Sequence, residues 1–147
     1  MPHAEGSTVI AGRRPDEVFD FLADGANNPR WRVGVADISR ETGAAVGLGT
    51  VYRQGMRGPM GRRIAADYRI TEYDPGRALG FEVIAGPARP TGRYELTPTQ
   101  SGTAVRFTLD WRPTGLARLL APAVARQMPR EVAALGRLKQ VMEAGPA

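Results

Sequence analysis

A short strand is predicted at 7–14, and further along, through the middle of the chain, hydrophobic and polar residues alternate with a period of two. This alternation indicates strands that bury one face. It predicts further strands at 35–41, 49–56, 63–73, 78–84, 91–97 and 103–112. Turns rich in glycine and proline, such as Asp74-Pro75-Gly76, separate them. Because the connections are too short for crossover helices, we expect the strands to pair as an antiparallel meander.

Helical spacing replaces the alternation between the first two strands. Pro15 opens a predicted amphipathic helix with Val18 and Leu22 on its apolar face, and Asp24-Gly25 ends it. A second, short helical turn is predicted at 26–31. The sequence therefore predicts two short helices before the sheet continues.

The tail from residue 115 to 144 returns to helical spacing. Its apolar stripe consists of Val132, Leu135, Leu138, Val141 and Met142. Pro122 and Pro129 are expected to kink or split this segment, because proline lacks the N–H that an inner helical turn needs. We therefore predict a short helix near 116–120 and a regular helix only from about Pro129.

The two faces of the predicted strands differ in chemistry. The inward face carries Tyr52, Gln54, Met56, Ala66, Tyr68, Ile70, Leu79, Phe81, Val83, Tyr94, Leu96, Val105, Phe107, Leu109 and Trp111. The outward face carries mainly charged residues of both signs, namely Arg53, Asp67, Arg69, Glu82, Arg93, Glu95, Arg106, Asp110 and Arg112. Opposite charges pair across neighbouring strands on a solvated sheet face, so we interpret most of these arginines as partners in ion pairs.

A curved sheet with one apolar face needs a cover, and the C-terminal helix is the long apolar helix available. Sheet and helix then enclose a space, which is either a ligand pocket or a plain core in which methionine fills gaps. If it is a pocket, its predicted lining is Trp31, Tyr52, Gln54, Met56, Tyr68, Ile70, Phe81, Val83, Tyr94, Leu96, Phe107, Leu109, Trp111 and Met128.

Composition narrows the possible chemistry. The chain has 147 residues, which fits one domain over 1–147 with a flexible start at 1–6. It has no cysteine, and its single histidine is His3, close to the N-terminus. Cys-His and Ser-His catalysis and metal sites built from cysteines or several histidines are therefore excluded, and we expect no cofactor and no metal.

The formal net charge is +5, and Lys139 is the only lysine among 20 basic residues. The arginines are dispersed among acidic residues rather than clustered, so we expect no nucleic-acid partner. No segment resembles a targeting signal or a membrane span. We expect a soluble, cytoplasmic protein that is a monomer or a homodimer.

Several motifs in a fixed order carry a family resemblance. They are residues 11–22 followed by Trp31, Gly47-Leu48-Gly49-Thr50, residues 68–75 with Arg77-Ala78-Leu79, residues 102–105, and Leu138-Lys139 with Glu143. Through these motifs the sequence resembles, over nearly its whole length, the polyketide cyclase/dehydrase and lipid-transport family of the START-like (SRPBCC) superfamily. The resemblance implies an α+β helix-grip fold. That fold is a curved antiparallel sheet of six to seven strands wrapped around a long C-terminal helix, with two short helices between the first and second strands.

The families that share this resemblance include lipid and sterol carriers, hormone receptors and polyketide aromatase/cyclases, so the resemblance leaves the activity of this chain open. We favour the binding of a hydrophobic or amphipathic small molecule, such as a lipid, a polyketide or an isoprenoid-like metabolite. The alternative is a cofactor-independent cyclase, aromatase or dehydratase. The inward face offers Tyr52, Tyr68 and Tyr94 for proton transfer but no carboxylate, and Arg57 or Arg89 at the mouth could stabilise an enolate.

The segment 115–130 alternates leucines with arginines, which leaves two interpretations open. A basic amphipathic stretch can lie on an anionic bilayer. It can also cap the pocket with its apolar face and leave its arginines in solvent. We favour the cap over membrane contact.

Overall fold

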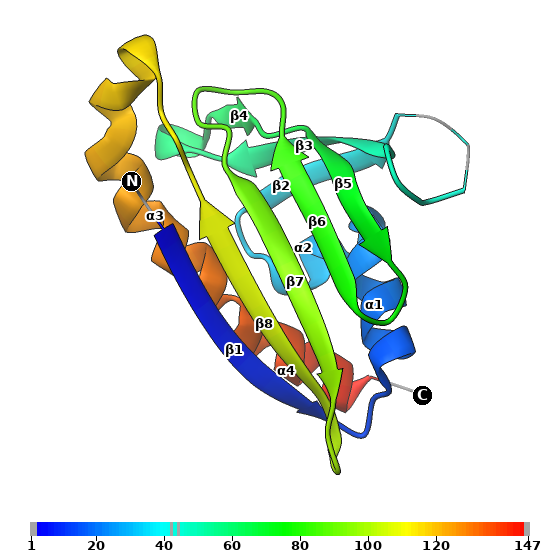
Figure 1. Ribbon diagram of the computed structural model, residues 1–147. Coiled ribbons are helices and arrows are strands. Elements are labelled where there is room, and N and C mark those ends of the chain that lie inside the picture. The colour runs from blue at the N-terminus through cyan, green and yellow to red at the C-terminus, as the bar shows by residue number, and fades with distance from the viewer. Residues whose placement is uncertain (1–2, 42, 44, 146–147) are drawn as a thin grey trace.

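The computed structural model describes residues 3–41, 43 and 45–145 of the chain (Figure 1). Its strands are β1 His3–Ala11, β2 Val35–Arg40, β3 Val51–Arg57, β4 Arg63–Ala65, β5 Tyr68–Asp74, β6 Ala78–Val83, β7 Thr91–Pro98 and β8 Gly102–Asp110. Its α-helices are α1 Pro15–Ala23, α2 Asn28–Trp31, α3 Ala121–Ala133 and α4 Leu135–Ala144. Three short 3₁₀ helices are η1 Gly25–Asn27, η2 Pro59–Gly61 and η3 Gly115–Leu120.

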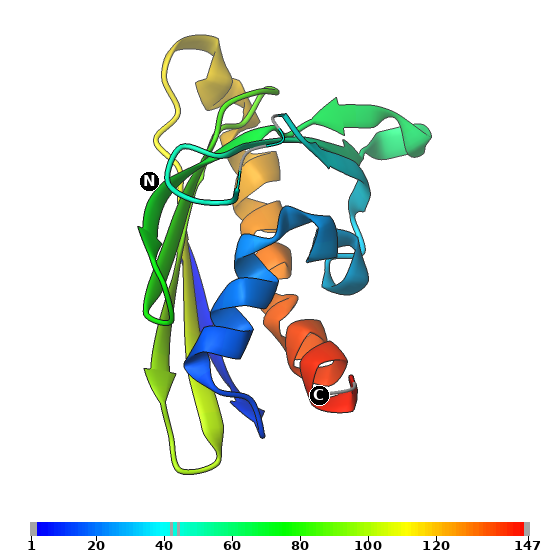
Figure 2. The ribbon, with the colours of Figure 1, turned by 90° about the vertical axis from the view of Figure 1, so that its right-hand side faces the viewer.

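The strands form one curved sheet in the order β1-β8-β7-β6-β5-β3-β2, with β4 beside β3, and every pairing is antiparallel. α3 and α4 run along its concave side, and α1 lies against the same side (Figure 2). The two short helices α1 and α2 fall between β1 and β2. The α+β helix-grip fold that the resemblance implies is therefore confirmed.

The first strand begins earlier than the sequence predicts. Residues 3–6, expected to be flexible, pair with β8 as the first half of β1. Nδ1 of His3 lies 2.6 Å from a carboxylate oxygen of Asp110 at the end of this ladder. Residues 1 and 2 lie outside the described residues.

The strand predicted at 63–73 is divided into β4 and β5. The division occurs at Asp67, whose side-chain carboxylate takes the place of a backbone carbonyl in the ladder with β3. Its carboxylate accepts the backbone N–H of Gln54 at 3.1 Å, while the N–H of Ala66 donates to the Gln54 carbonyl at 2.8 Å. β5 pairs with the start of β3, and β4 pairs with its end.

The prediction that the regular C-terminal helix begins at about Pro129 is wrong, because α3 already begins at Ala121 and continues through Pro129. Pro122 falls in the first turn, where no N–H is needed. Pro129 is exposed, so the carbonyl four residues earlier can bond to water instead of to the missing N–H. The break comes after Ala133, and α4 follows.

Packing divides the concave side of the sheet into a filled end and an end that holds a pocket. α1 packs against β6, β7 and β8, and α4 packs against β1. Val18, Phe19 and Leu138 are fully buried there, and the Phe19 ring meets Tyr73 edge-on at 5.0 Å between centroids. This end is a plain core, which anchors the strands whose other ends form the pocket.

The outer face of the sheet carries ion pairs, as predicted. Arg93 on β7 bonds Glu72 at 2.7 Å, and Arg106 on β8 bonds Glu5 at 2.6 Å. Such exposed pairs add little to the stability of a protein, and they need no ligand to explain them. None of the described helices is long and apolar enough to cross a membrane.

Candidate ligand-binding pocket

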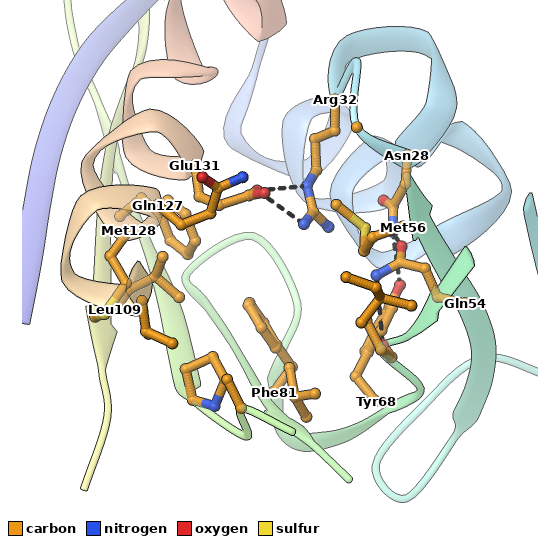
Figure 3. A pocket seen from close by; sticks show the side chains of 18 of the residues that line it. Asn28, Arg32, Gln54, Met56, Tyr68, Phe81, Leu109, Gln127, Met128 and Glu131 are labelled. Carbon is orange, nitrogen blue, oxygen red and sulfur yellow. Dashed lines mark hydrogen bonds and ion pairs between the residues drawn. The ribbon is translucent and has the colours of Figure 1, made fainter. Parts of the chain in front are cut away.

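A pocket of about 670 Å³ lies between the sheet and α3. Its walls come from all the strands β3 to β8, from α1, α2 and the α2–β2 connection, from the β6–β7 loop, and from η3 and α3 (Figure 3). This volume lies within the range of about 300–1,000 Å³ that is usual for small-molecule sites. The enclosed space that the sequence left open is therefore a pocket at this end of the sheet.

Most of the wall is apolar. Ten of the residues predicted to line a pocket do line it: Gln54, Met56, Tyr68, Ile70, Phe81, Val83, Tyr94, Phe107, Leu109 and Met128. The Tyr94 and Phe107 rings stack with centroids 4.3 Å apart. The Phe81 ring lies over Gly92 on the next strand, where a Cβ would come within 2.3 Å of the ring. Gly92 therefore makes the room in which Phe81 can lie.

The other four residues of the predicted lining, Trp31, Tyr52, Leu96 and Trp111, are buried in the core outside the lining. Trp31 meets Tyr94 edge-on at 6.4 Å between centroids. The Tyr52 hydroxyl donates to the Ala23 carbonyl at 3.2 Å. A period of two assigns these side chains to the inward face, but it does not indicate which part of that face the helices cover.

A buried polar network forms one side of the pocket. The side-chain amide of Asn28 donates to the Gln54 amide oxygen and to the Tyr68 hydroxyl, both at 3.0 Å. Gly25 lets η1 pack closely behind this network, because a Cβ there would lie 2.6 Å from the Tyr68 hydroxyl. The stacked rings of Tyr52 and Tyr68 support it from the sheet, with centroids 5.3 Å apart.

An ion pair joins two walls of the pocket. Nε and Nη2 of Arg32 donate to one carboxylate oxygen of Glu131 at 3.2 and 2.8 Å. Arg32 follows α2, Glu131 lies on α3, and the two side chains meet across the pocket (Figure 3). Both are largely buried, with 17% and 25% of the side chain exposed. Burial opposes the charge on Arg32, but the Glu131 carboxylate outweighs it and raises the pKa of Arg32.

Two tyrosine hydroxyls complete the polar side. Burial raises the pKa of both Tyr68 and Tyr94 above the usual value of 10. Both phenols therefore stay protonated at neutral pH and can donate hydrogen bonds, but neither is a base. The Arg32–Glu131 pair on this side of the pocket carries one positive and one negative charge, so its formal charge is zero. Among the described residues, no group of three or more carboxylates or imidazoles is arranged to hold a metal ion.

Sequence reasoning missed four polar lining residues, Asn28, Arg32, Gln127 and Glu131. It found no carboxylate on the inward face of the sheet, and Glu131 comes instead from the covering helix. A signal was present, because Leu120, Val124, Gln127 and Glu131 are spaced three or four residues apart and so share one helical face. Of the two arginines expected at the mouth, Arg57 lines the pocket, whereas Arg89 is exposed on the β6–β7 loop outside the lining.

The prediction that 115–130 caps the pocket with its apolar face is only partly right. Leu120 lines the pocket, but Leu116 is 84% exposed and Leu119 is 79% exposed. The reason is that η3 begins beyond the end of β8, where no strand lies beneath it (Figure 2). Two leucines of this segment therefore face solvent.

The sequence model of the family described as polyketide cyclase/dehydrase and lipid transport matches residues 1–143. A search of curated proteins found no match. Among solved structures, TTHA0849 from Thermus thermophilus is 22% identical, with a TM-score of 0.78, over 99% of this chain and 100% of that chain.

Two further solved structures share the fold. Ara h 8.0201 is 13% identical with a TM-score of 0.74, over 97% of this chain and 98% of that chain. The di-domain ARO/CYC BexL from the BE-7585A biosynthetic pathway is 21% identical with a TM-score of 0.72. That match covers 99% of this chain and 48% of the BexL chain. At these identities the likeness shows a common fold.

Proposed function

Because the chain belongs to the polyketide cyclase/dehydrase and lipid-transport family, we propose that its pocket binds a hydrophobic or amphipathic small molecule, such as a lipid, a polyketide or an isoprenoid-like metabolite. The observation that carries the proposal is a 670 Å³ pocket with a mainly apolar wall and one polar side. Apolar contact supplies the affinity of such a site, at about 25 cal/mol per Å² buried before ordering costs, and a few polar groups orient the ligand.

The polar side favours a ligand whose head is uncharged and carries oxygen. Arg32 and Glu131 neutralise each other, so an anionic or cationic head would lie beside a like charge and would lose its own hydration. Within the described part of the chain, Nη1 of Arg32 and the hydroxyl of Tyr94 have no hydrogen-bond partner. A ketone, ester or hydroxyl oxygen can accept from such donors.

Native mass spectrometry of the protein purified from its own host tests the proposal. We expect a stoichiometric hydrophobic molecule, which extraction would identify. The variant Val83→Trp fills the pocket and is expected to lose the molecule, whereas the control Leu48→Trp, on an exposed loop, keeps it. An empty protein whose melting temperature no lipid or polyketide shifts would contradict the proposal, as would equal occupancy in both variants.

A second candidate is a cofactor-independent cyclase or dehydratase, and Glu131 is the observation that favours it. Glu131 supplies the pocket with the carboxylate that the sheet lacks, and BexL, a protein of similar fold, is named as an ARO/CYC. In this reading Glu131 takes a proton from a carbon next to a carbonyl, while Arg32 and Tyr94 donate hydrogen bonds to the oxygen that becomes an enolate.

A turnover assay with a linear poly-β-ketone separates the two candidates. Catalysis predicts turnover that Glu131→Gln abolishes while binding of the same compound persists. Binding without turnover in the unaltered protein would rule out the second candidate for this substrate and leave the first.

A further inference from the structure

The rim of the pocket is defined by the lining residues that are themselves exposed. They are Arg57, Pro59, Pro87, Leu120, Ala123 and Gln127. They come from three segments, 57–66 around η2 and β4, 84–90 before β7, and 112–130 around η3 and α3. η3 and the β3–β4 hairpin stand at the same end of the molecule, opposite the β7–β8 turn (Figures 1 and 2).

The three rim segments hold an excess of positive charge. They contain eight of the 20 basic residues and none of the 15 acidic residues. Arg63 pairs with Asp37 on β2 at 2.8 Å. The remaining seven, which make no ion pair within the described residues, are Arg57, Arg62, Arg89, Arg112, Arg118, Arg126 and Arg130. The positive excess of the protein is therefore concentrated around the pocket, whereas the arginines on the outer sheet face are neutralised.

The same segments display large apolar side chains. Met60 is 99% exposed at the tip of η2, and Leu116 and Leu119 project from η3. Met60 directly follows the rim residue Pro59, and Leu119 directly precedes the rim residue Leu120. Met60 also adopts a φ of 60°, a left-handed conformation that L residues seldom take. Its exposure at such a position points to a use outside the fold.

We propose that the pocket rim docks on an anionic lipid bilayer, with Leu116, Leu119 and Met60 entering the interface and the unpaired rim arginines contacting lipid phosphates. Apolar side chains beside basic ones match the boundary between acyl chains and charged headgroups. A nucleic acid or an acidic protein would also attract the arginines, but neither explains the exposed leucines around an apolar pocket. Docked in this way, the pocket opens toward the bilayer rather than toward water.

Co-sedimentation with vesicles tests this surface and needs no pocket ligand, so its outcome is separable from that of the proposed function. Vesicles of phosphatidylcholine alone are compared with vesicles containing 30% phosphatidylglycerol, roughly the fraction that gives a strong surface potential, at about 20 and 500 mM NaCl. We expect binding to the anionic vesicles at low salt and its loss at high salt.

Two double variants probe the two kinds of contact. Each basic side chain at an anionic membrane surface strengthens the binding of a protein to vesicles about fivefold. The double variant Arg118→Gln with Arg126→Gln should therefore bind the anionic vesicles about 25-fold more weakly. Leu116→Ser with Leu119→Ser should weaken this binding at least tenfold, because two leucines then no longer enter the interface. The matched controls are Arg77→Gln on the β5–β6 turn and Leu48→Ser, both exposed and away from the rim, and they should bind like the unaltered protein.

All four leucine and arginine sites of the double variants are exposed, so folding should be unaffected, and circular dichroism checks this. Failure of the unaltered protein to bind anionic vesicles at low salt would overturn the proposal. Loss of binding in the arginine variant but not in the leucine variant would also overturn it, and would indicate an acidic macromolecule as the partner instead. Equal loss in the controls would show unspecific attraction and would overturn it too.

Discussion

Replacing Phe81 with alanine should cost much less stability than the same change at Phe19. Phe19 is fully buried between α1 and the sheet, where Phe→Ala removes the transfer free energy of the ring and leaves an enclosed cavity, at about 3–5 kcal/mol. The Phe81 ring is only half-buried and already borders the 670 Å³ pocket. Loss of the Phe81 ring enlarges an existing space and encloses no new one, so the part of the free-energy cost that comes from a new cavity largely disappears.

The remaining cost at Phe81 comes from its ring contacts. Its centroid lies 5.6 Å from that of Tyr68, 6.1 Å from that of Tyr94 and 6.2 Å from that of Phe107. The ring also covers the bare backbone of Gly92. At these separations each pair contributes near the lower end of about 0.5–1.5 kcal/mol, so the three pairs give about 1.5 kcal/mol together, and partial burial of the ring adds about 0.5 kcal/mol. We expect Phe81→Ala to lower the free energy of unfolding by about 2 kcal/mol, and Phe19→Ala by about 4 kcal/mol.

Equilibrium urea unfolding measures both costs, provided that the dependence of the free energy on urea stays unchanged between variants. The ligand-free protein is required, because a bound ligand would add its own stabilisation. Equal losses of about 4 kcal/mol at both positions would refute the reasoning. They would mean that Phe81 is packed as tightly as Phe19 and that the wall of the pocket is closed in solution.

Three further changes test individual features. Gly25→Ala should lower the free energy of unfolding by about 1–3 kcal/mol, and with it the melting temperature, because the new Cβ would lie 2.6 Å from the Tyr68 hydroxyl. An unchanged melting temperature would contradict the close packing at this position. Asn28→Ala should lower the free energy of unfolding, measured in urea, by about 1–3 kcal/mol, because Gln54 and Tyr68 lose their buried hydrogen-bond donor. Asn28→Asp should lower it as well, because a carboxylate supplies no N–H in place of the amide. The hydrogen bond from Arg93 lowers the pKa of the Glu72 carboxyl below its usual 4.5. The pair therefore stabilises the fold fully above about pH 4.5, and this stabilisation is lost as the pH falls through the lowered pKa. Glu72→Gln removes it, so the melting temperature of the variant should differ less between about pH 7 and pH 3 than that of the unaltered protein.

Strand positions were predictable from the sequence because burial of one sheet face imposes a period of two on the residues themselves. Tyr94 and Phe107 were assigned inward on that ground alone, and both line the pocket. The break at Asp67 was not predictable in this way. It depends on one carboxylate that accepts a backbone N–H of a neighbouring strand, and hydropathy does not register such a bond.

The polar side of the pocket was the part that pattern reasoning could not find. Arg32 and Glu131 are 99 residues apart and meet only because α2 and α3 cover the same side of the sheet. A charged residue on a predicted helix is normally assigned to solvent, so Glu131 gave no sign of burial by its type. Its spacing from Val124 and Gln127 was the available signal, and it requires knowing which helical face covers the sheet.

The uneven placement of charge also has a consequence at a distance. Seven of the eight arginines around the rim make no ion pair within the described part of the chain, while the outer sheet face pairs Arg93 and Arg106 with glutamates. The molecule therefore carries an electric dipole whose positive end lies at the pocket. In the field of any negatively charged surface this dipole exerts a torque before contact, within a Debye length of about 10 Å at 0.1 M salt. The protein then arrives with its opening first, so encounter is faster than a random search over orientations, and added salt slows it.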